Sequence, residues 1–215
     1  MLLGLLLRLP LGLLLPGCSP STELRVASAP ASPPLTEAHR QTALERGKAV
    51  SAETFSILSS NLLGAIQSGG VSNALPFCSL AASPLTAGIA TRHGVTLRRV
   101  THKPRNPTNR ADAAELAVIQ SYQGLLSSAS ISSTNLPPPT VTNMAPGRTT
   151  FFAPILLSKE LCLKCHGNPG KDIAAGDLEI IRRLYSTDEA TGFVMGELRG
   201  LWRIDFPTAL LDPKP

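Results

Sequence analysis

The stretch LCLKCHG, residues 161–167, places Cys162, Cys165 and His166 at positions i, i+3 and i+4 of a short helix that Ser158 is expected to cap. Residues at this spacing share one face of a helix. A Cys-x-x-Cys-His run can attach a haem through two thioethers, contribute to a zinc site, or form a redox-active disulfide. Each alternative requires its own compartment, further ligands and fold, so the remaining sequence has to decide among them.

The first 17 residues, MLLGLLLRLPLGLLLPG, are almost all leucine and are interrupted by Arg8 and Pro10. They are too short and too broken for a permanent transmembrane helix, and they predict a signal peptide. The sequence Leu-Pro-Gly-Cys that ends at Cys18 is similar to a bacterial lipoprotein cleavage box. We therefore expect an exported, periplasmic protein that a lipid on Cys18 anchors to a membrane surface. Secretion without a lipid and a leader retained in the membrane are the alternatives.

Residues 18–35 are rich in Ser, Pro and Ala and predict an extended tether. The segment 36–210 is long enough for one domain with its own core. Aromatic residues make up only 4% of the chain, so aliphatic side chains or a large apolar group such as a haem must complete this core.

The early part of the domain predicts two helices. The first runs from Thr36 to about Gln67 and ends at Gly69-Gly70, and the second carries Cys78 on its apolar face. Pro84 is expected to kink or end this second helix.

The later part predicts mainly strands. Asp112 and Glu115 form a capping pair for a helix that reaches about Tyr122, and a low-complexity loop follows at 127–138. We expect strands at 94–103, 140–143 and 149–157, a short helix at 178–184 and a final hairpin at 191–206. The sum is an α+β domain with an antiparallel sheet and long N-terminal helices.

The surroundings of the cysteine pair favour haem over zinc or a disulfide. Zinc needs about four ligands, and His39, His93 and His102 are scattered. No thioredoxin-like βαβ pattern surrounds the pair, and a disulfide centre would leave the adjacent His166 unexplained. An exported chain with this motif is expected to bind one haem c through Cys162 and Cys165, with His166 as an iron ligand.

The second iron ligand is open at this level. Cys78 is either a small buried hydrophobic residue or an axial ligand. The competing candidates are Met144, Met195, His93 and His102.

The formal charge of +5 is unevenly distributed. The stretch 92–111 contains no acidic residue and six basic ones: Arg92, Arg98, Arg99, Lys103, Arg105 and Arg110. This pattern indicates either a solvated face or a site for an acidic protein, anionic lipid or haem propionates. Nucleic acid is not an expected partner of an exported chain.

Three stretches together carry a family resemblance: LRRVTHKPRNPTNRADAAE (97–115), FFAPILLSKELCLKCHG (151–167) and YSTDEATGFVMGELRG (185–200). Their marks are Arg-Asn-Pro at 105–107 with Asn109, the late haem motif, and Ala-Thr-Gly at 190–192. Over residues 45–206 the chain resembles the exported c-type haem domains with a PAS-like fold, which occur alone and as sensor regions of bacterial signalling proteins.

The resemblance implies a covalent haem whose iron lies between His166 and Cys78. Arg105 is the candidate partner of a haem propionate, and the alternative is an arginine that stabilises a loop through backbone carbonyls. The expected function is redox or gas sensing through a signalling partner, with low-potential electron transfer as the alternative. An enzyme is not expected, because two strong axial ligands leave the iron no open position. A homodimer is also considered.

Overall fold

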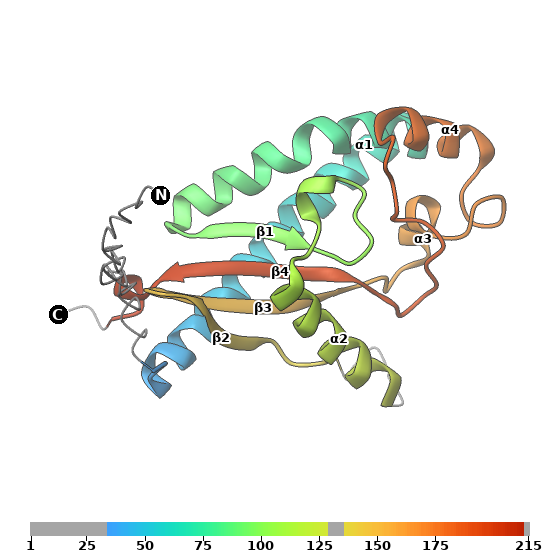
Figure 1. The fold of residues 1–215 in the computed structure, drawn as a ribbon. Coiled ribbons are helices and arrows are strands. Elements are labelled where there is room, and N and C mark those ends of the chain that lie inside the picture. Colours follow the sequence, from blue (N-terminus) through green and yellow to red (C-terminus); the bar gives the residue numbers. More distant parts are fainter. Residues whose placement is uncertain (1–33, 129–135, 213–215) are drawn as a thin grey trace, which may run out of the picture. The chain divides into compact units, whose positions relative to one another are not determined.

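The computed structural model describes residues 34–128 and 136–212, within a compact unit that spans Ser32–Pro215. The predicted signal peptide, Cys18 and nearly all of the tether lie outside the described residues. Within this unit a four-stranded antiparallel sheet, in the order β1-β4-β3-β2, is combined with four α-helices (Figure 1). The predicted α+β class, with an antiparallel sheet and a long N-terminal helix, is confirmed.

The strands are β1 (Thr96–Val100), β2 (Thr140–Ala145), β3 (Arg148–Leu156) and β4 (Leu198–Pro207). The helices are α1 (Glu37–His93), α2 (Ala113–Ser128), α3 (Glu160–His166) and α4 (Ala175–Leu184), and two short 3-10 turns, η1 (Pro107–Asn109) and η2 (Thr208–Leu210), complete the chain. Helix α2 therefore continues beyond the expected end near Tyr122.

Helix α1 consists of two arms. Thr36 caps the first arm by accepting a hydrogen bond from the backbone N–H of His39, as expected from the sequence. Gly69 and Gly70 leave the helical conformation, and Gly70 has a φ of 74°, which favours glycine. The second arm continues through Pro84 to His93, so of the two alternatives expected there, a kink or a stop, the stop is wrong. Pro84 and Leu80 are both exposed, so water can bond the carbonyl that the proline leaves free.

The two faces of the sheet are covered by different helices (Figure 1). On one face, α1 packs through Val50 and Ile89 against Phe151, Trp202 and neighbouring buried residues. On the other face, α2 packs through Ile119 and Tyr122 against Phe152 and Leu201. Alternate residues of β1 and β4 therefore contribute to different layers. Leu97 lies in the α1 layer, which places Arg99 on the same side of the strand.

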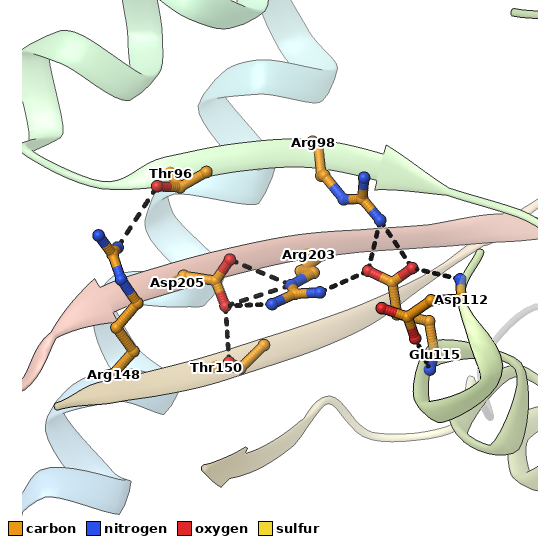
Figure 2. A network of polar contacts seen from close by, with 8 residues as sticks. All are labelled: Thr96, Arg98, Asp112, Glu115, Arg148, Thr150, Arg203 and Asp205. Carbon is orange, nitrogen blue, oxygen red and sulfur yellow. Dashed lines mark hydrogen bonds and ion pairs between the residues drawn. The ribbon is translucent and has the colours of Figure 1, made fainter. Parts of the chain in front are cut away.

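A buried ionic network joins α2 to the sheet (Figure 2). The carboxylate of Glu115 is completely buried and accepts hydrogen bonds from Arg98 and Arg203, each at 2.6 Å. It also accepts the backbone N–H of Asp112, whose own carboxylate accepts the N–H of Glu115. The predicted capping pair is thus present, and it is extended into the sheet by the two arginines.

Two local expectations are wrong. Lys159, not Ser158, occupies the N-cap of α3, and it makes no side-chain capping bond. The final hairpin is absent, because its expected first half does not pair with β4. Instead, the backbone N–H groups of Gly192, Phe193 and Gly196 donate to the carbonyls of Gly167, His166 and Leu157. Residues 190–196 therefore form a loop held against the end of α3.

Candidate functional site

Helix α3 presents the cysteine pair and the histidine. Cys162 and Cys165 are free thiols, and both, like His166, are half-buried. Cys162 packs beside Phe193 and Leu157, whereas Cys165 packs beside Leu75 and Ile181. The two thiols therefore contact different apolar clusters: one contains residues of α1 and α4, and the other contains the residues Leu157 and Phe193 on either side of α3 in the sequence.

Gly167, the C-cap of α3, lies where the chain is crowded. A Cβ at this position would lie 2.5 Å from the Cβ of Asp172 and 2.7 Å from the carbonyl oxygen of Leu163. Asp172 also accepts the backbone N–H of Asn168. Only glycine allows the loop to return this closely to the end of the helix.

The imidazole of His166 is fixed in orientation. Its Nδ1 lies 2.8 Å from the carbonyl oxygen of Ala190, and a carbonyl only accepts, so Nδ1 carries the proton. Burial, with further contributions from Arg199, Arg105 and Arg99, holds the pKa of His166 well below its usual value. The ring is therefore neutral at neutral pH, and its Nε2 retains a lone pair that can bind a metal.

Arg105 holds the loop that orients His166. It donates to both carboxylate oxygens of Asp188, at 3.0 and 3.2 Å, and to the carbonyls of Cys165 (2.6 Å) and Ala190 (3.4 Å). The side chains of Arg105 and Asp188 are only 12% and 7% exposed. These contacts are the ones expected of an arginine that stabilises a loop through backbone carbonyls. The role of Arg105 as a partner of a haem propionate stays a prediction.

Cys78 reaches the same region from the second arm of α1. Val71 and Leu75 of that arm belong to the apolar cluster that contacts Cys165. Burial raises the pKa of Cys78, against the opposing effect of Arg99 and Arg105. Burial also raises the pKa of Cys165 to about 11, and Cys78 contributes to that rise. The fold therefore brings together Cys78 and the Cys-x-x-Cys-His helix, which are far apart in the sequence.

Two further arginines lie around this site. Arg99 is near Cys78 and Tyr185, and burial lowers its pKa. Arg199 donates through Nη1 to Thr101 Oγ1 and to the carbonyl of Lys103, both at 3.1 Å. Its Nε is buried and has no hydrogen-bond partner among the described residues. Burial, followed by the charges of Arg105 and Arg99, lowers the pKa of Arg199 to about 9.

Three of the other candidate ligands, His93, Met144 and Met195, are placed elsewhere or bonded to other groups, whereas the buried Nδ1 of His102 has no hydrogen-bond partner among the described residues. The Nε2 of His93 lies 2.6 Å from Glu53 Oε2, and the Nε2 of His39 lies 2.9 Å from Asp212 Oδ1. His102 contacts the edge of Phe193, whose ring separately contacts His166. Met144 packs on the α2 layer, and Met195 is 44% exposed. Within residues 34–128 and 136–212, no group of three or more His, Cys, Asp or Glu side chains is arranged to hold a metal ion.

The basic stretch 92–111 is largely neutralised by acids from elsewhere in the fold. Ion pairs join Arg92 to Glu53, Arg98 to Glu115, Arg105 to Asp188 and Arg110 to Glu189. Neither an open basic face nor a simple solvated one describes this stretch. Among its guanidinium groups, Arg99 is the one that makes no ion pair with the described residues.

The sequence model of the Tll0287-like family matches residues 31–207, which include every part of this site. The chain belongs to the Tll0287-like family. Among solved structures, the crystal structure of the cyanobacterial haem protein Tll0287 matches with a TM-score of 0.53 and 23% identity. The match covers 76% of this chain and 94% of that one, and it shows a shared fold. Comparison with curated proteins gives no match.

Sequence reasoning missed several residues of the site. Asp188 and the carbonyl of Ala190 orient Arg105 and His166, and the ring of Phe193 contacts both His166 and His102. The Ala-Thr-Gly run at 190–192 was a signal for this loop, but its link to the end of α3 required the structure. Arg199 had no signal at all, because nothing in the sequence distinguishes it from a solvated arginine.

Proposed function

We propose that this chain binds one haem c covalently through the thiols of Cys162 and Cys165, with His166 and Cys78 as the iron ligands. The observation that carries the proposal is the position of Cys78 on a helical arm whose Leu75 packs in the same cluster as Cys165, with Cys78 among the electrostatic neighbours of Cys165. The family supports it as well, because Tll0287, whose fold this chain shares, is described as a haem protein.

The residues present fit such a group in three respects. Two unpaired thiols lie at the spacing that haem attachment requires. His166 is neutral with Nε2 free of the hydrogen bond that orients the ring. Among the described residues the buried Nε of Arg199 has no hydrogen-bond partner and Arg99 has no ion-pair partner, which is an environment that a ligand with carboxylates would satisfy.

Each residue has a distinct part in this proposal. His166 offers a lone pair whose direction is set by the bond to Ala190, and Cys78 offers a sulfur from α1. Arg105, which is paired with Asp188, bonds the carbonyl of Cys165 at the end of α3 and the carbonyl of Ala190 at the start of the 190–196 loop. The ring of His166 is therefore already held in one orientation before a ligand binds. When bound, the haem supplies an iron that changes redox state and binds diatomic gases.

Redox or gas sensing is the use that the fold supports best. The proposed ligands come from two elements, α1 and α3, and the arm that carries Cys78 begins at the Gly69-Gly70 break. Loss of the Cys78 ligand would release a constraint on that arm, which is a means of passing a signal to a partner protein. Electron transfer is the alternative, but the neutralised basic stretch does not supply the docking face expected for it.

The remaining parts of the proposal rest on the sequence pattern. We place the protein in the periplasm, attached to a membrane through a lipid on Cys18, and acting through a separate redox or signalling protein. We do not propose an enzymatic reaction, because the two ligands would occupy both axial positions of the iron.

The first test is covalent attachment. Protein matured in cells that contain a cytochrome c maturation system should be coloured, and the colour should remain with the chain after extraction with acidic acetone. Replacing both Cys162 and Cys165 by serine should release the haem on extraction, whereas serine at Cys78 should not. A colourless parent protein would assign the cysteine pair to thiol or zinc chemistry and would overturn the proposal.

The second test separates sensing from electron transfer. Carbon monoxide added to the reduced protein should displace the Cys78 ligand, with a shift of the Soret band. Reversible one-electron voltammetry with no response to carbon monoxide or nitric oxide would favour electron transfer and rule out gas sensing.

A further inference from the structure

We propose that Arg99 and Arg199 bind the two propionates of the haem, while Arg105 acts only as a positioning residue. This inference rests on the proposed function, because it concerns the same bound group. It is carried by the hydrogen bonds, ion pairs and strand positions of three arginines that surround His166.

The first observation is an imbalance of charge. Arg99, Arg105 and Arg199 all act electrostatically on His166, and Arg105 and Arg99 both act on Arg199. Asp188 is the carboxylate that pairs with this group, and both of its oxygens are bonded to Arg105. Two guanidinium charges therefore lie in a partly buried site without a carboxylate partner in the described part of the chain, an arrangement that is unfavourable unless an anion neutralises them.

The second observation is the unused hydrogen-bonding capacity of Arg199. Its Nη1 is bonded to Thr101 and to the carbonyl of Lys103, which fixes the guanidinium plane. Its Nε is buried and unbonded among the described residues. A guanidinium that is fixed on one side and unsatisfied at Nε is suited to bind a carboxylate.

The third observation is the position of Arg99. Arg99 and Trp202 are paired residues of β1 and β4, and Trp202 packs in the layer that α1 covers. Arg99 thus projects toward the side from which Cys78 comes, and Cys78 is among its electrostatic neighbours. The two unpaired cations come from β1 and from the start of β4, so they approach the site from adjacent strands.

The number and chemistry of the cations match the ligand. A haem carries two propionate groups, and each is a carboxylate that an arginine can bind in a bidentate manner. Arg105 has its Nε and Nη2 committed to Asp188 and two carbonyls, whereas Arg99 and Arg199 have no carboxylate partner among the described residues, so we assign the propionates to Arg99 and Arg199.

The experiment compares haem with its dimethyl ester, in which both propionates are neutral. The parent for this titration is the full chain with Cys162→Ala and Cys165→Ala, to which ferric haem is expected to bind reversibly because no thioether can form. Arg99→Gln and Arg199→Gln should each weaken haem binding about ten- to a hundredfold. Both should change binding of the ester by less than about threefold, because the ester has no charge for the arginine to meet.

Two outcomes would overturn the assignment. Equal losses for haem and ester would show that the arginines stabilise the fold rather than bind propionates, and unchanged binding would show that they do not contact the haem. Arg148→Gln is the control, because Arg148 is exposed and its side chain makes one long hydrogen bond among the described residues, 3.5 Å from Nη1 to Thr96 Oγ1. If the parent is coloured and covalently loaded but these results fail, the proposed function stands without this inference.

A second measurement uses the covalently loaded chain and does not depend on the thioether-free parent. Loss of a partner cation raises the pKa of an ionised propionate, so a pH-dependent step in the reduction potential should move to higher pH in Arg99→Gln and Arg199→Gln. The charged and titratable side chains around this site include Arg99, Arg105, Arg199, Lys103, Asp177, Asp188, Glu197, His102, Tyr185 and Cys78, and only Arg99 and Arg199 are changed. Curves identical to that of the Arg148→Gln protein would exclude both residues as propionate partners.

Discussion

Replacing Glu115 by alanine is expected to lower the free energy of unfolding by about 3–5 kcal/mol. The carboxylate is completely buried and accepts hydrogen bonds from Arg98, Arg203 and the backbone of Asp112 (Figure 2). Its removal leaves Arg98 without its carboxylate partner, leaves Arg203 with Asp205 alone, and also removes one side of the capping box of α2. Chemical denaturation, followed by circular dichroism, measures the change.

The matched control is Glu189→Ala. Glu189 pairs with Arg110 in the same way, but both side chains are about half exposed, at 44% and 53%. An exposed ion pair contributes at most about 1 kcal/mol. Equal stabilities of the Glu115→Ala and Glu189→Ala proteins would contradict the buried position of Glu115 and the role of the network in joining α2 to β1 and β4.

The sequence predicted elements wherever the local pattern was complete. Thr36, the Gly69-Gly70 break and the Asp112–Glu115 pair each combine a short polar or glycine signal with an apolar period, and each forms as expected. These features depend on residues a few positions apart. The structure of such segments can be inferred without knowledge of their tertiary neighbours.

The errors arise where tertiary contacts decide. The 191–206 segment has glycines and apolar residues in a hairpin-like order, but its first half bonds to the end of α3. The arginines of residues 92–111 resembled an exposed basic stretch, because the acids that neutralise Arg92, Arg98 and Arg105 lie 17 to 83 positions away in the sequence. Ion pairs between residues far apart in the sequence leave no local pattern. The lack of an ion-pair partner for Arg99 and Arg199 among the described residues leaves none either.

In the candidate site, too, the residues that share a local pattern were predicted, and those placed by tertiary contacts were not. Cys162, Cys165 and His166 were predicted from their spacing on one helix, and α3 carries all three. Cys78 was proposed from a family resemblance, and the structure adds the packing of its helical arm on Cys165. The orientation of His166 by Ala190 could not be foreseen, since it depends on a backbone carbonyl that is distant in the sequence and lies just before the segment expected to form a hairpin.

Replacing Cys78 by alanine is expected to convert the ferric haem from low spin to high spin while the haem stays covalently attached. The expectation follows from the proposed ligation, in which Cys78 supplies one of two strong axial ligands and Cys162 and Cys165 hold the ring independently of it. The absorption and electron paramagnetic resonance spectra of the oxidised protein measure the change.

Two further variants make the result specific to the sulfur of Cys78. Cys78→Met should restore a low-spin spectrum and raise the reduction potential relative to the parent, because a neutral thioether replaces an anionic thiolate on the iron. Met195→Leu, at an exposed position that was a competing candidate, should leave the spectrum unchanged. A ferric spectrum of Cys78→Ala that matches the parent would remove Cys78 from the iron. The argument that ligand loss frees the second arm of α1 would then fail with it, because that arm would no longer be joined to the iron.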